Sequence, residues 1–398
     1  MLLRSQSVRQ TFSASQAQYN SNNILVKFLG AGDNGEAYTA ISKSDADRIV
    51  AKHLVKDNLT QECFDELRAN LTVVKFYKPT NLEGDLSNEI DFLTKVVTTP
   101  HPRITYCVKS HLRGSAQSLT LPLCSGGNLE SFTEEHGASF TPSFIWHAGL
   151  QLTEAVCLLL FGITDCDKDM TPAPGHPTVF HGDIWSGNTV LRPSEDSDSS
   201  FGNYCNMVVA DFGRAQKLHP EAPCGEQARH LHNQWRDVGQ IGCTMSYLRL
   251  MMRYLIAKQD CSVHGGTKGN CPTALTAMHA KPSSLSLTDS TLGLWIEQFS
   301  KIASDGSDPI TDCLPFLTRF MATAKRQRAL CYEPLSAEAI AYMSGKKVRN
   351  EELATALIQR WASSGDKPMR RRRRRLYRLL GALFGVGPWT VHIGAGRS

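Results

Sequence analysis

The residues from Phe180 to Asn188 combine side-chain types that can carry out phosphoryl transfer. They read FHGDIWSGN, so a histidine, an aspartate and an asparagine follow an apolar residue in the pattern H-x-D-x-x-x-x-N. A second aspartate, Asp211, directly follows the apolar run Met207 to Ala210. Phosphoryl transfer needs one carboxylate to orient or deprotonate the attacking hydroxyl, and an amide with a second carboxylate to hold magnesium against the triphosphate. The pattern therefore predicts an ATP- and magnesium-dependent reaction.

The elements that would position these residues start with a glycine-rich turn. An apolar strand is expected from Asn23, and a second strand with the sequence EAYTAIS follows the glycines Gly30, Gly32 and Gly35. A dinucleotide-binding turn would lead into a helix instead, so that hypothesis fails. Glycines in this arrangement are more often an ordinary hairpin turn, but a turn of this kind is also suited to covering phosphate groups.

The next elements predict a small antiparallel sheet with one helix. Thr72 to Tyr77 has the β-branched and aromatic content of a strand, whereas Ser87 to Val97 is amphipathic and predicts a helix. Ser44 to Leu71 has a helical pattern that begins with a capping box. Two further strands are expected near Ile104 to Val108 and Ser118 to Leu123.

The chain is expected to become mainly helical from Phe144 onward. The first helix reads FIWHAGLQLTEAVCLLLF, and no run of about 20 apolar residues, as a membrane span requires, is expected. Residues 260–289 are poor in large apolar side chains and predict an irregular insertion. The fold class that follows is α+β, with a small sheet-containing lobe and a larger helical lobe. Further helices are expected near Val238–Ile256, Thr288–Ile302, Cys313–Ala324 and Ser336–Met343.

The same residues resemble the protein kinase-like superfamily over most of the chain from Asn23 to about Met343. GAGDNG, which starts at Gly30, is similar to the loop that covers the phosphates, HGDIWSGN to the catalytic loop, and DFG, which starts at Asp211, to the metal-binding turn. Glu89 resembles the regulatory-helix glutamate. The resemblance implies a two-lobed kinase-like fold. Further similar segments are HPRI at 101–104, the hinge-like LTLPLCSGGNL at 119–129, and RDVGQIG at 236–242, whose Asp237 would brace the catalytic loop.

The resemblance also implies a role for each residue of the site. Asp183 would be the catalytic base, and Asn188 and Asp211 would be the metal ligands. The glycine loop would cover the bound nucleotide, and Glu89 would pair with a lysine that binds phosphate. The implied cofactors are ATP and Mg²⁺.

Two lysines are candidates for the phosphate-binding role. Lys52 follows Gly35 at a spacing familiar from kinases, but a long segment separates it from Glu89. Lys75 lies in the better strand, TVVKFY, and directly precedes the helix that carries Glu89. We favour Lys75 because its local structure and its short connection agree. The other lysine would then be a solvated surface residue.

Departures from the protein-kinase pattern bear on the substrate. Gly182 replaces the arginine of H-R-D, so control by an activation-loop phosphate is not expected. Trp185 replaces a lysine that lies near the transferred phosphate, and HGDIWSGN is similar to the loop of fructosamine, aminoglycoside and choline kinases. No A-P-E segment occurs between Asp211 and Asp237. The first expectation is a Ser/Thr protein kinase, and the alternatives are a kinase for a small hydroxyl compound and a pseudokinase scaffold.

Each motif alone also has an ordinary structural explanation. His181 is more often a packed histidine than a catalytic one, and Asp237 could simply cap a helix. The motifs nevertheless occur together and in register, which favours the kinase-like hypothesis over separate explanations for each of them.

Basic residues are concentrated near one end of the sequence. Eight of the 43 basic residues and none of the 38 acidic ones lie from Arg370 onward, which leaves a small net negative charge before that point. No specific nucleic-acid partner is therefore expected. The run Arg370 to Arg375 continues into LYRLLGALFGV and could bind an acidic partner or a membrane surface, carry a nuclear address, or be an inert tail.

Twelve cysteines without a C-x-x-C pair predict reduced thiols in an intracellular protein, cytoplasmic or nuclear. The acid-free stretch up to Gly32 resembles a transit peptide in composition, so a mitochondrial address is the alternative. Cys261, His264 and Cys271 lack a fourth ligand, so zinc is not expected. We expect a monomer. The predicted order is a disordered tail at 1–22, a small lobe at 23–121, a helical lobe at 122–366 and a basic tail at 367–398.

Overall fold

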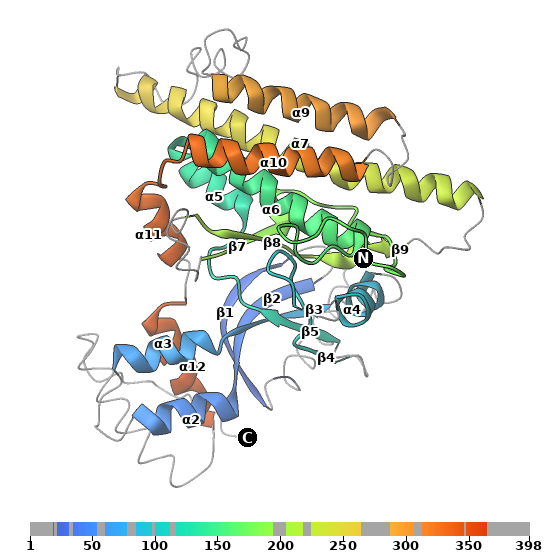
Figure 1. Cartoon of the computed structure of the whole chain (residues 1–398). Coiled ribbons are helices and arrows are strands. Elements are labelled where there is room, and N and C mark those ends of the chain that lie inside the picture. Colours follow the sequence, from blue (N-terminus) through green and yellow to red (C-terminus); the bar gives the residue numbers. More distant parts are fainter. Residues whose placement is uncertain are drawn as a thin grey trace, which may run out of the picture. The chain divides into compact units, whose positions relative to one another are not determined.

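The protein is α+β, with one five-stranded antiparallel sheet and a largely helical remainder, as the sequence predicted (Figure 1). It divides into two compact units that interleave in sequence. The sheet unit comprises described residues within 1–82, 108–123 and 347–398, and the helical unit comprises those within 83–107 and 124–346. The computed structural model describes residue 19 and residues 22–31, 35–53, 60–77, 85–97, 100–111, 117–193, 204–217, 224–263, 287–305, 313–345 and 348–363.

The sheet of the sheet unit has the strand order β1-β2-β3-β5-β4. In β3, the strand that its β-branched and aromatic content predicted, Val74 and Phe76 are buried while Lys75 between them is partly exposed. Gly35 is required at the start of β2, because a Cβ there would lie 1.9 Å from the carbonyl oxygen of Phe76. The strands are β1 Asn23–Ala31, β2 Gly35–Ser42, β3 Thr72–Tyr77, β4 Lys109–His111 and β5 Ser118–Pro122.

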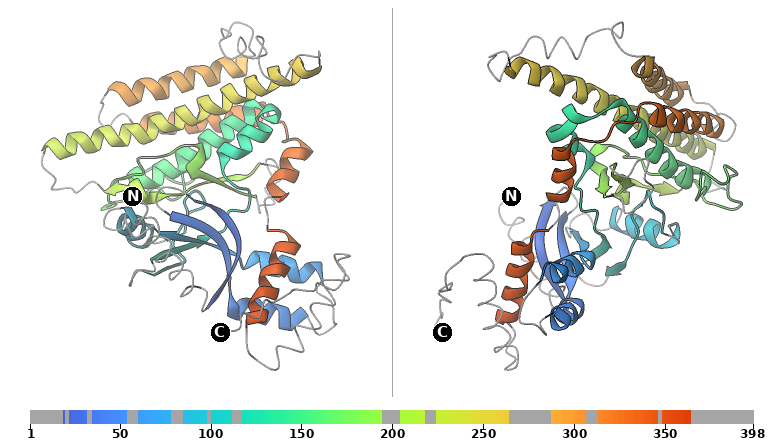
Figure 2. Two further views of the ribbon diagram at one scale, coloured as in Figure 1. Left: turned by 180° about the vertical axis from the view of Figure 1, so that it is seen from behind. Right: turned by 60° about the vertical axis from the view of Figure 1, so that its left-hand side comes forward.

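Three helices belong to the sheet unit: α2 Lys43–His53, α3 Gln61–Ala69 and α12 Asn350–Ser363. Figure 2 shows α12 beside α2 and α3, although the sequence separates them widely. Arg68 Nε donates to the carbonyl of Val348 over 2.8 Å and ties α3 to the residues before α12. The helical pattern at Ser44 to Leu71 predicted the region of α2 and α3, whereas α12 was not predicted. The shared core includes Ile24, Ile41, Ile49, Phe64, Leu67, Leu353 and Leu357.

The helical unit is organised around one long buried helix, α6 Pro142–Phe161. Thr141 caps its start by accepting the backbone N–H of Phe144, and Gly162 ends it in the left-handed conformation. Two other long helices of this unit, α7 and α10, lie beside α6, and α9 lies beside α7 (Figures 1 and 2). The described helices of the unit are α4 Asp85–Lys95, α5 Leu129–His136, α6, α7 Cys224–Val263, α9 Leu287–Asp305, α10 Leu314–Leu330 and α11 Ala337–Gly345.

Helix α6 corrects one expectation. No apolar run of membrane-spanning length was expected from the sequence, yet α6 is long and apolar enough to cross a membrane by length and composition, with a mean hydropathy of 1.5 over its most apolar window. Within the protein 89% of that window is buried. Residues such as Trp146, Leu152 and Leu160 make it a core helix of the described structure.

Two small sheets carry the segments that the sequence singled out. Strand β6 Val179–Phe180 pairs with β9 Gln216–Lys217, and β7 Thr189–Arg192 pairs with β8 Asn206–Val209, both antiparallel. Ile104 forms only an isolated parallel bridge with Val209. The strand that was expected at Ile104 to Val108 lies further along the chain, as β4 Lys109–His111. Residues 264–286 of the expected insertion, His264, Cys271 and the Arg370 to Arg375 run lie outside the described residues.

Candidate active site

The loop after β6 is fixed first by His181. This side chain is buried, and its Nε2 donates to the carbonyl of Ala210 over 3.0 Å. Its Nδ1 accepts the backbone N–H of Asp183 over 3.2 Å, and its ring packs edge-on against Phe212. His181 is therefore a packed histidine that joins the Asp183 loop to the end of β8, and these bonds assign it no chemical role of its own.

Asp183 and Asn188 are brought together by a one-turn 3₁₀ helix at Ser186–Asn188. Asn188 Nδ2 donates to Asp183 Oδ2 and to the Asp183 carbonyl, both over 3.0 Å. The amide nitrogen is thereby directed at Asp183, which leaves Oδ1 of Asn188 as the oxygen that can act as a ligand. The Asp183 side chain is 29% exposed, so its carboxylate is open to a substrate.

Two side chains of helix α7, one buried and one partly buried, accept hydrogen bonds from the backbone of this loop. Asp237 accepts the backbone N–H groups of His181 and Gly182, the second over 2.8 Å. Gln240 Oε1 accepts the backbone N–H of Ile184 over 2.7 Å. Asp237 lies well inside α7, so its explanation as a simple helix cap is wrong. Three amides of the loop, at His181, Gly182 and Ile184, are thus held by one helix.

The carboxyl group of Asp237 is strongly affected by its surroundings. Burial raises its pKa to about 7, and the negative charge of Asp183 acts in the same direction. The amides of Gly182 and His181 and the charge of Arg236 act against this shift but do not cancel it. A buried carboxyl group next to a candidate catalytic loop is therefore expected to titrate close to neutral pH.

Asp211 lies two residues beyond the end of β8 in an unusual backbone conformation. The N–H of Ala210 donates to the carbonyl of Asn188 over 2.9 Å, which joins the two loops beside their polar side chains. Asp211 has φ 64° and is the only described residue other than glycine with positive φ. Such conformations cost free energy and are concentrated at functional sites.

Glu89 on α4 is joined to the same turn. Its side chain is buried, and Oε1 accepts the backbone N–H of Phe212 over 3.3 Å. Phe92, one helical turn further along α4, stacks on the Phe212 ring at 4.5 Å between centroids. Helix α4 therefore packs against the residues that follow Asp211. The predicted pairing of Glu89 with a lysine stays a prediction, because both candidate lysines belong to the sheet unit.

The sheet unit contains the predicted nucleotide-binding residues. Gly30 lies near the end of β1 and Gly35 begins β2, whereas Gly32 lies outside the described residues. Lys75 lies on β3, with Nζ 5.1 Å from the centre of the Tyr77 ring. Lys52 lies instead on the exposed surface of α2. The predicted cleft between the glycine loop and the Asp183 loop stays a prediction, because the two segments belong to different units.

Lys52 has a partner that explains its position. Its Nζ lies 2.7 Å from Glu66 Oε2, and 62% of its side chain is exposed. The hydrogen bonds from Lys52 and His53 lower the pKa of Glu66 to about 2. This is the environment of the solvated surface lysine that the sequence analysis expected for one of the two candidates.

Three residues near Asp183 were not assigned a role from sequence. The guanidinium of Arg214 lies 3.6 Å from Asp183 Oδ1 and is largely exposed. Trp185 is 43% exposed, and its ring covers Gly187, where a Cβ would lie 2.4 Å from the indole. Gln240 stands in the RDVGQIG segment, which drew attention only for its aspartate. No local pattern marks Arg214 or Gln240, because their partners are distant in sequence.

The oxygen atoms in this region suit magnesium. Asp211 offers a carboxylate and Asn188 an amide oxygen, both hard ligands, and magnesium is commonly held by one or two carboxylates together with substrate phosphates. Among the described residues no group of three or more His, Cys, Asp or Glu side chains could hold a metal ion by itself. Asp211 and Asn188 together supply two protein oxygens of the kind that magnesium binds.

Comparisons with known proteins do not assign the chain to a family: no family model matches it, and no curated protein matches it.

Proposed function

We propose that the protein is an ATP- and magnesium-dependent phosphotransferase with a two-lobed, protein kinase-like fold, and that it transfers the γ-phosphate to a hydroxyl group. One observation carries the proposal. The Asn188 amide donates a hydrogen bond to the Asp183 carboxylate over 3.0 Å, and Asp237 accepts the N–H of Gly182 in the same loop. The Asn188 carbonyl accepts the N–H of Ala210, the residue before Asp211. A carboxylate, an amide and a second carboxylate are the groups that this reaction requires.

Each residue has a definite task in the proposed reaction. Asp183 accepts the proton of the attacking hydroxyl, and the Asn188 amide holds the Asp183 carboxylate in place. Asn188 Oδ1 and Asp211 would hold magnesium, which neutralises charge that develops on the phosphate oxygens. The resemblance to kinases implies that Lys75 would pair with Glu89 and bind the phosphates, and that the glycine loop would cover them.

The first candidate acceptor is a serine or threonine of a protein. A second candidate, a small hydroxyl compound, is favoured by the short connection at residues 218–223 between β9 and α7. That length leaves little chain for a platform on which a peptide could dock. The left-handed Gly182 also stands where protein kinases place an arginine that receives a regulatory phosphate.

A transfer assay tests the proposal. Purified protein is incubated with labelled ATP and magnesium, with general protein acceptors in one reaction and sugars or amino alcohols in the other. Asp183→Ala should lower transfer by about 10²- to 10⁴-fold, the contribution of a positioned general base, while ATP binding is retained. Asp169→Ala, which removes a side chain of an exposed loop, is the matched control and should transfer at the unmodified rate. Absence of label in both reactions, together with no thermal shift by magnesium and ATP, would contradict the proposal.

A further inference from the structure

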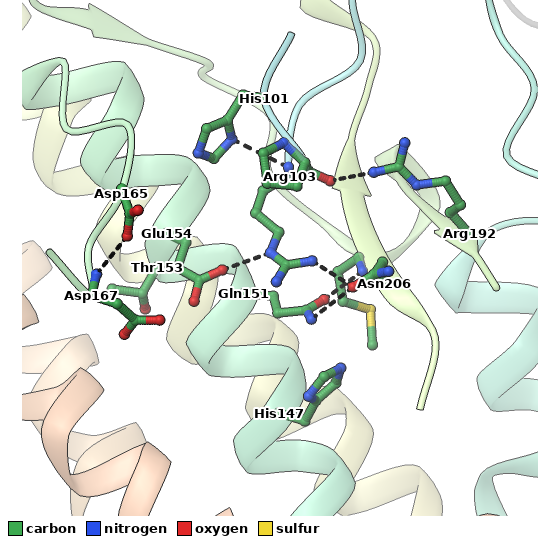
Figure 3. Close-up of polar contacts among 12 residues, drawn as sticks. His101, Arg103, His147, Gln151, Thr153, Glu154, Asp165, Asp167, Arg192 and Asn206 are labelled. Atoms are coloured by element: carbon green, nitrogen blue, oxygen red, sulfur yellow. Dashed lines mark hydrogen bonds and ion pairs between the residues drawn. The ribbon is translucent and has the colours of Figure 1, made fainter. Parts of the chain in front are cut away.

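A polar cluster next to the site is centred on Arg103, as Figure 3 shows. Arg103 Nε donates to Glu154 Oε2 on α6, and Nη1 donates to Asn206 Oδ1 at the start of β8, both over 2.6 Å. The side chains of Arg103 and Glu154 are only 16% and 18% exposed. A partly buried arginine that donates through two nitrogens fixes its partners more firmly than an exposed ion pair does.

The backbone of the same residue is bonded to the other end of β8. The N–H of Val209 donates to the Arg103 carbonyl over 2.9 Å, and the N–H of Thr105 donates to the Val209 carbonyl over 3.0 Å. The segment around Ile104 therefore lies along β8 as a parallel partner. Arg103 thus contacts β8 at its first residue through the side chain and at its last residue through the backbone.

Helix α6 completes the attachment of β8. Gln151 Nε2 donates to Asn206 Oδ1 over 3.2 Å, and Gln151 Oε1 accepts the N–H of Met207 over 2.6 Å. Figure 3 shows Gln151 and Glu154 on the same helix, facing Asn206 and Arg103. Asp211 lies two residues beyond the end of β8, so these bonds bear on the position of its backbone relative to α6.

We propose that Arg103 is a positioning residue for Asp211, so that the magnesium-dependent part of nucleotide binding depends on its contacts with Glu154 and Asn206. The inference rests on the proposed function, in which Asp211 is a metal ligand. Arg103 itself touches neither substrate nor metal. Its effect on binding passes through β8, whose other end is held near the Asn188 carbonyl by Ala210.

The test compares nucleotide affinity with and without metal. Calorimetric titration of the full chain with ATP, once with magnesium and once with EDTA, gives two dissociation constants whose ratio is the magnesium enhancement. Arg103→Met should reduce this enhancement about tenfold or more, the usual cost of removing a residue that orients a metal ligand. Affinity in EDTA should stay near its unmodified value. Arg103→Lys should retain only part of the enhancement, because the lysine ammonium group can bond to Glu154 or Asn206 but cannot reach both as the arginine fork does.

Matched variants separate positioning from a general loss of structure. Arg349→Met removes an arginine that is 67% exposed and pairs only at the surface with Glu351 and Glu352, so it should leave the enhancement unchanged. Glu154→Gln keeps the size of the side chain and tests the same contact if Arg103→Met does not fold. It should also reduce the enhancement.

The unmodified protein distinguishes this inference from the proposed function. If it binds ATP with a magnesium enhancement and folded Arg103→Met and Glu154→Gln keep that enhancement, the positioning role is overturned and the proposed function stands. An equal loss of affinity in magnesium and in EDTA also overturns the positioning role. If the unmodified protein shows no magnesium enhancement, both proposals are overturned.

Discussion

The carboxylate of Asp237 accepts the backbone N–H of Gly182 over 2.8 Å and so holds, from inside helix α7, the residue that precedes Asp183. The same carboxylate accepts the N–H of His181. A fully buried carboxyl group with two amide donors is ordered by the fold and in turn orders the loop. Its titration should therefore affect stability.

We expect Asp237→Asn to change the pH dependence of unfolding. Burial raises the pKa of Asp237 from 3.8 to about 7, so the folded protein keeps a proton that the unfolded chain releases. The contribution of this group to stability is full below about pH 4 and is lost as the pH rises through about 7. Asparagine does not titrate. The difference in unfolding free energy between the unmodified protein and the variant should thus be larger at about pH 5 than at about pH 8. Urea denaturation at both pH values measures it, and equal differences would contradict the expectation.

We expect Gly182→Ala to lower both stability and transfer. Gly182 has φ 77°, and a Cβ there would lie 3.2 Å from the carbonyl oxygen of Arg214. The left-handed conformation alone should cost about 1–2 kcal/mol in unfolding free energy. Gly175→Ala is the control, because its φ is 72° with open space around the Cβ, and it should cost stability without lowering transfer. Denaturation and the transfer assay check the pair, and equal transfer by the two variants would argue against a role for loop geometry.

The elements that depend on local pattern could be predicted from the sequence. Strand β3 has the predicted bounds, because TVVKFY is rich in β-branched and aromatic residues. Helix α6 is marked by Thr141, Pro142 and Gly162 at its ends. Asp183 and Asn188 adjoin as expected, because their separation along one short loop leaves them few other arrangements.

The features that depend on contacts between distant segments could not be predicted. The apolar face of α12 packs against α3 and β1, which lie far away in sequence. Arg103, Glu154 and Asn206 are unremarkable as single residues, and their connection exists only after α6 and β8 pack together. The grouping of α4 with the helical unit likewise follows from the packing of Phe92 on Phe212. Sequence spacing carries no signal for such pairings.

We expect Asp211→Asn to remove the magnesium dependence of ATP binding. The substitution keeps the size of the side chain and a residue type that tolerates positive φ, so the fold should be retained. It removes the only charge among the proposed metal ligands. Affinity for ATP in magnesium should fall to the value that the unmodified protein shows in EDTA, as calorimetry can measure. Retention of a magnesium effect would show that Asp211 is not a ligand.

We expect Lys75→Met and Lys52→Met to differ sharply, although both remove a lysine from the sheet unit. Lys75 lies on β3 beside Tyr77, and loss of a charge-assisted hydrogen bond to phosphate should lower ATP affinity about tenfold or more. Lys52 is largely exposed and paired with Glu66, and such surface pairs contribute at most about 1 kcal/mol to stability. Lys52→Met should therefore leave ATP affinity unchanged. Calorimetric titration of both variants decides between the lysines, and the opposite order of effects would assign the phosphate-binding role to Lys52.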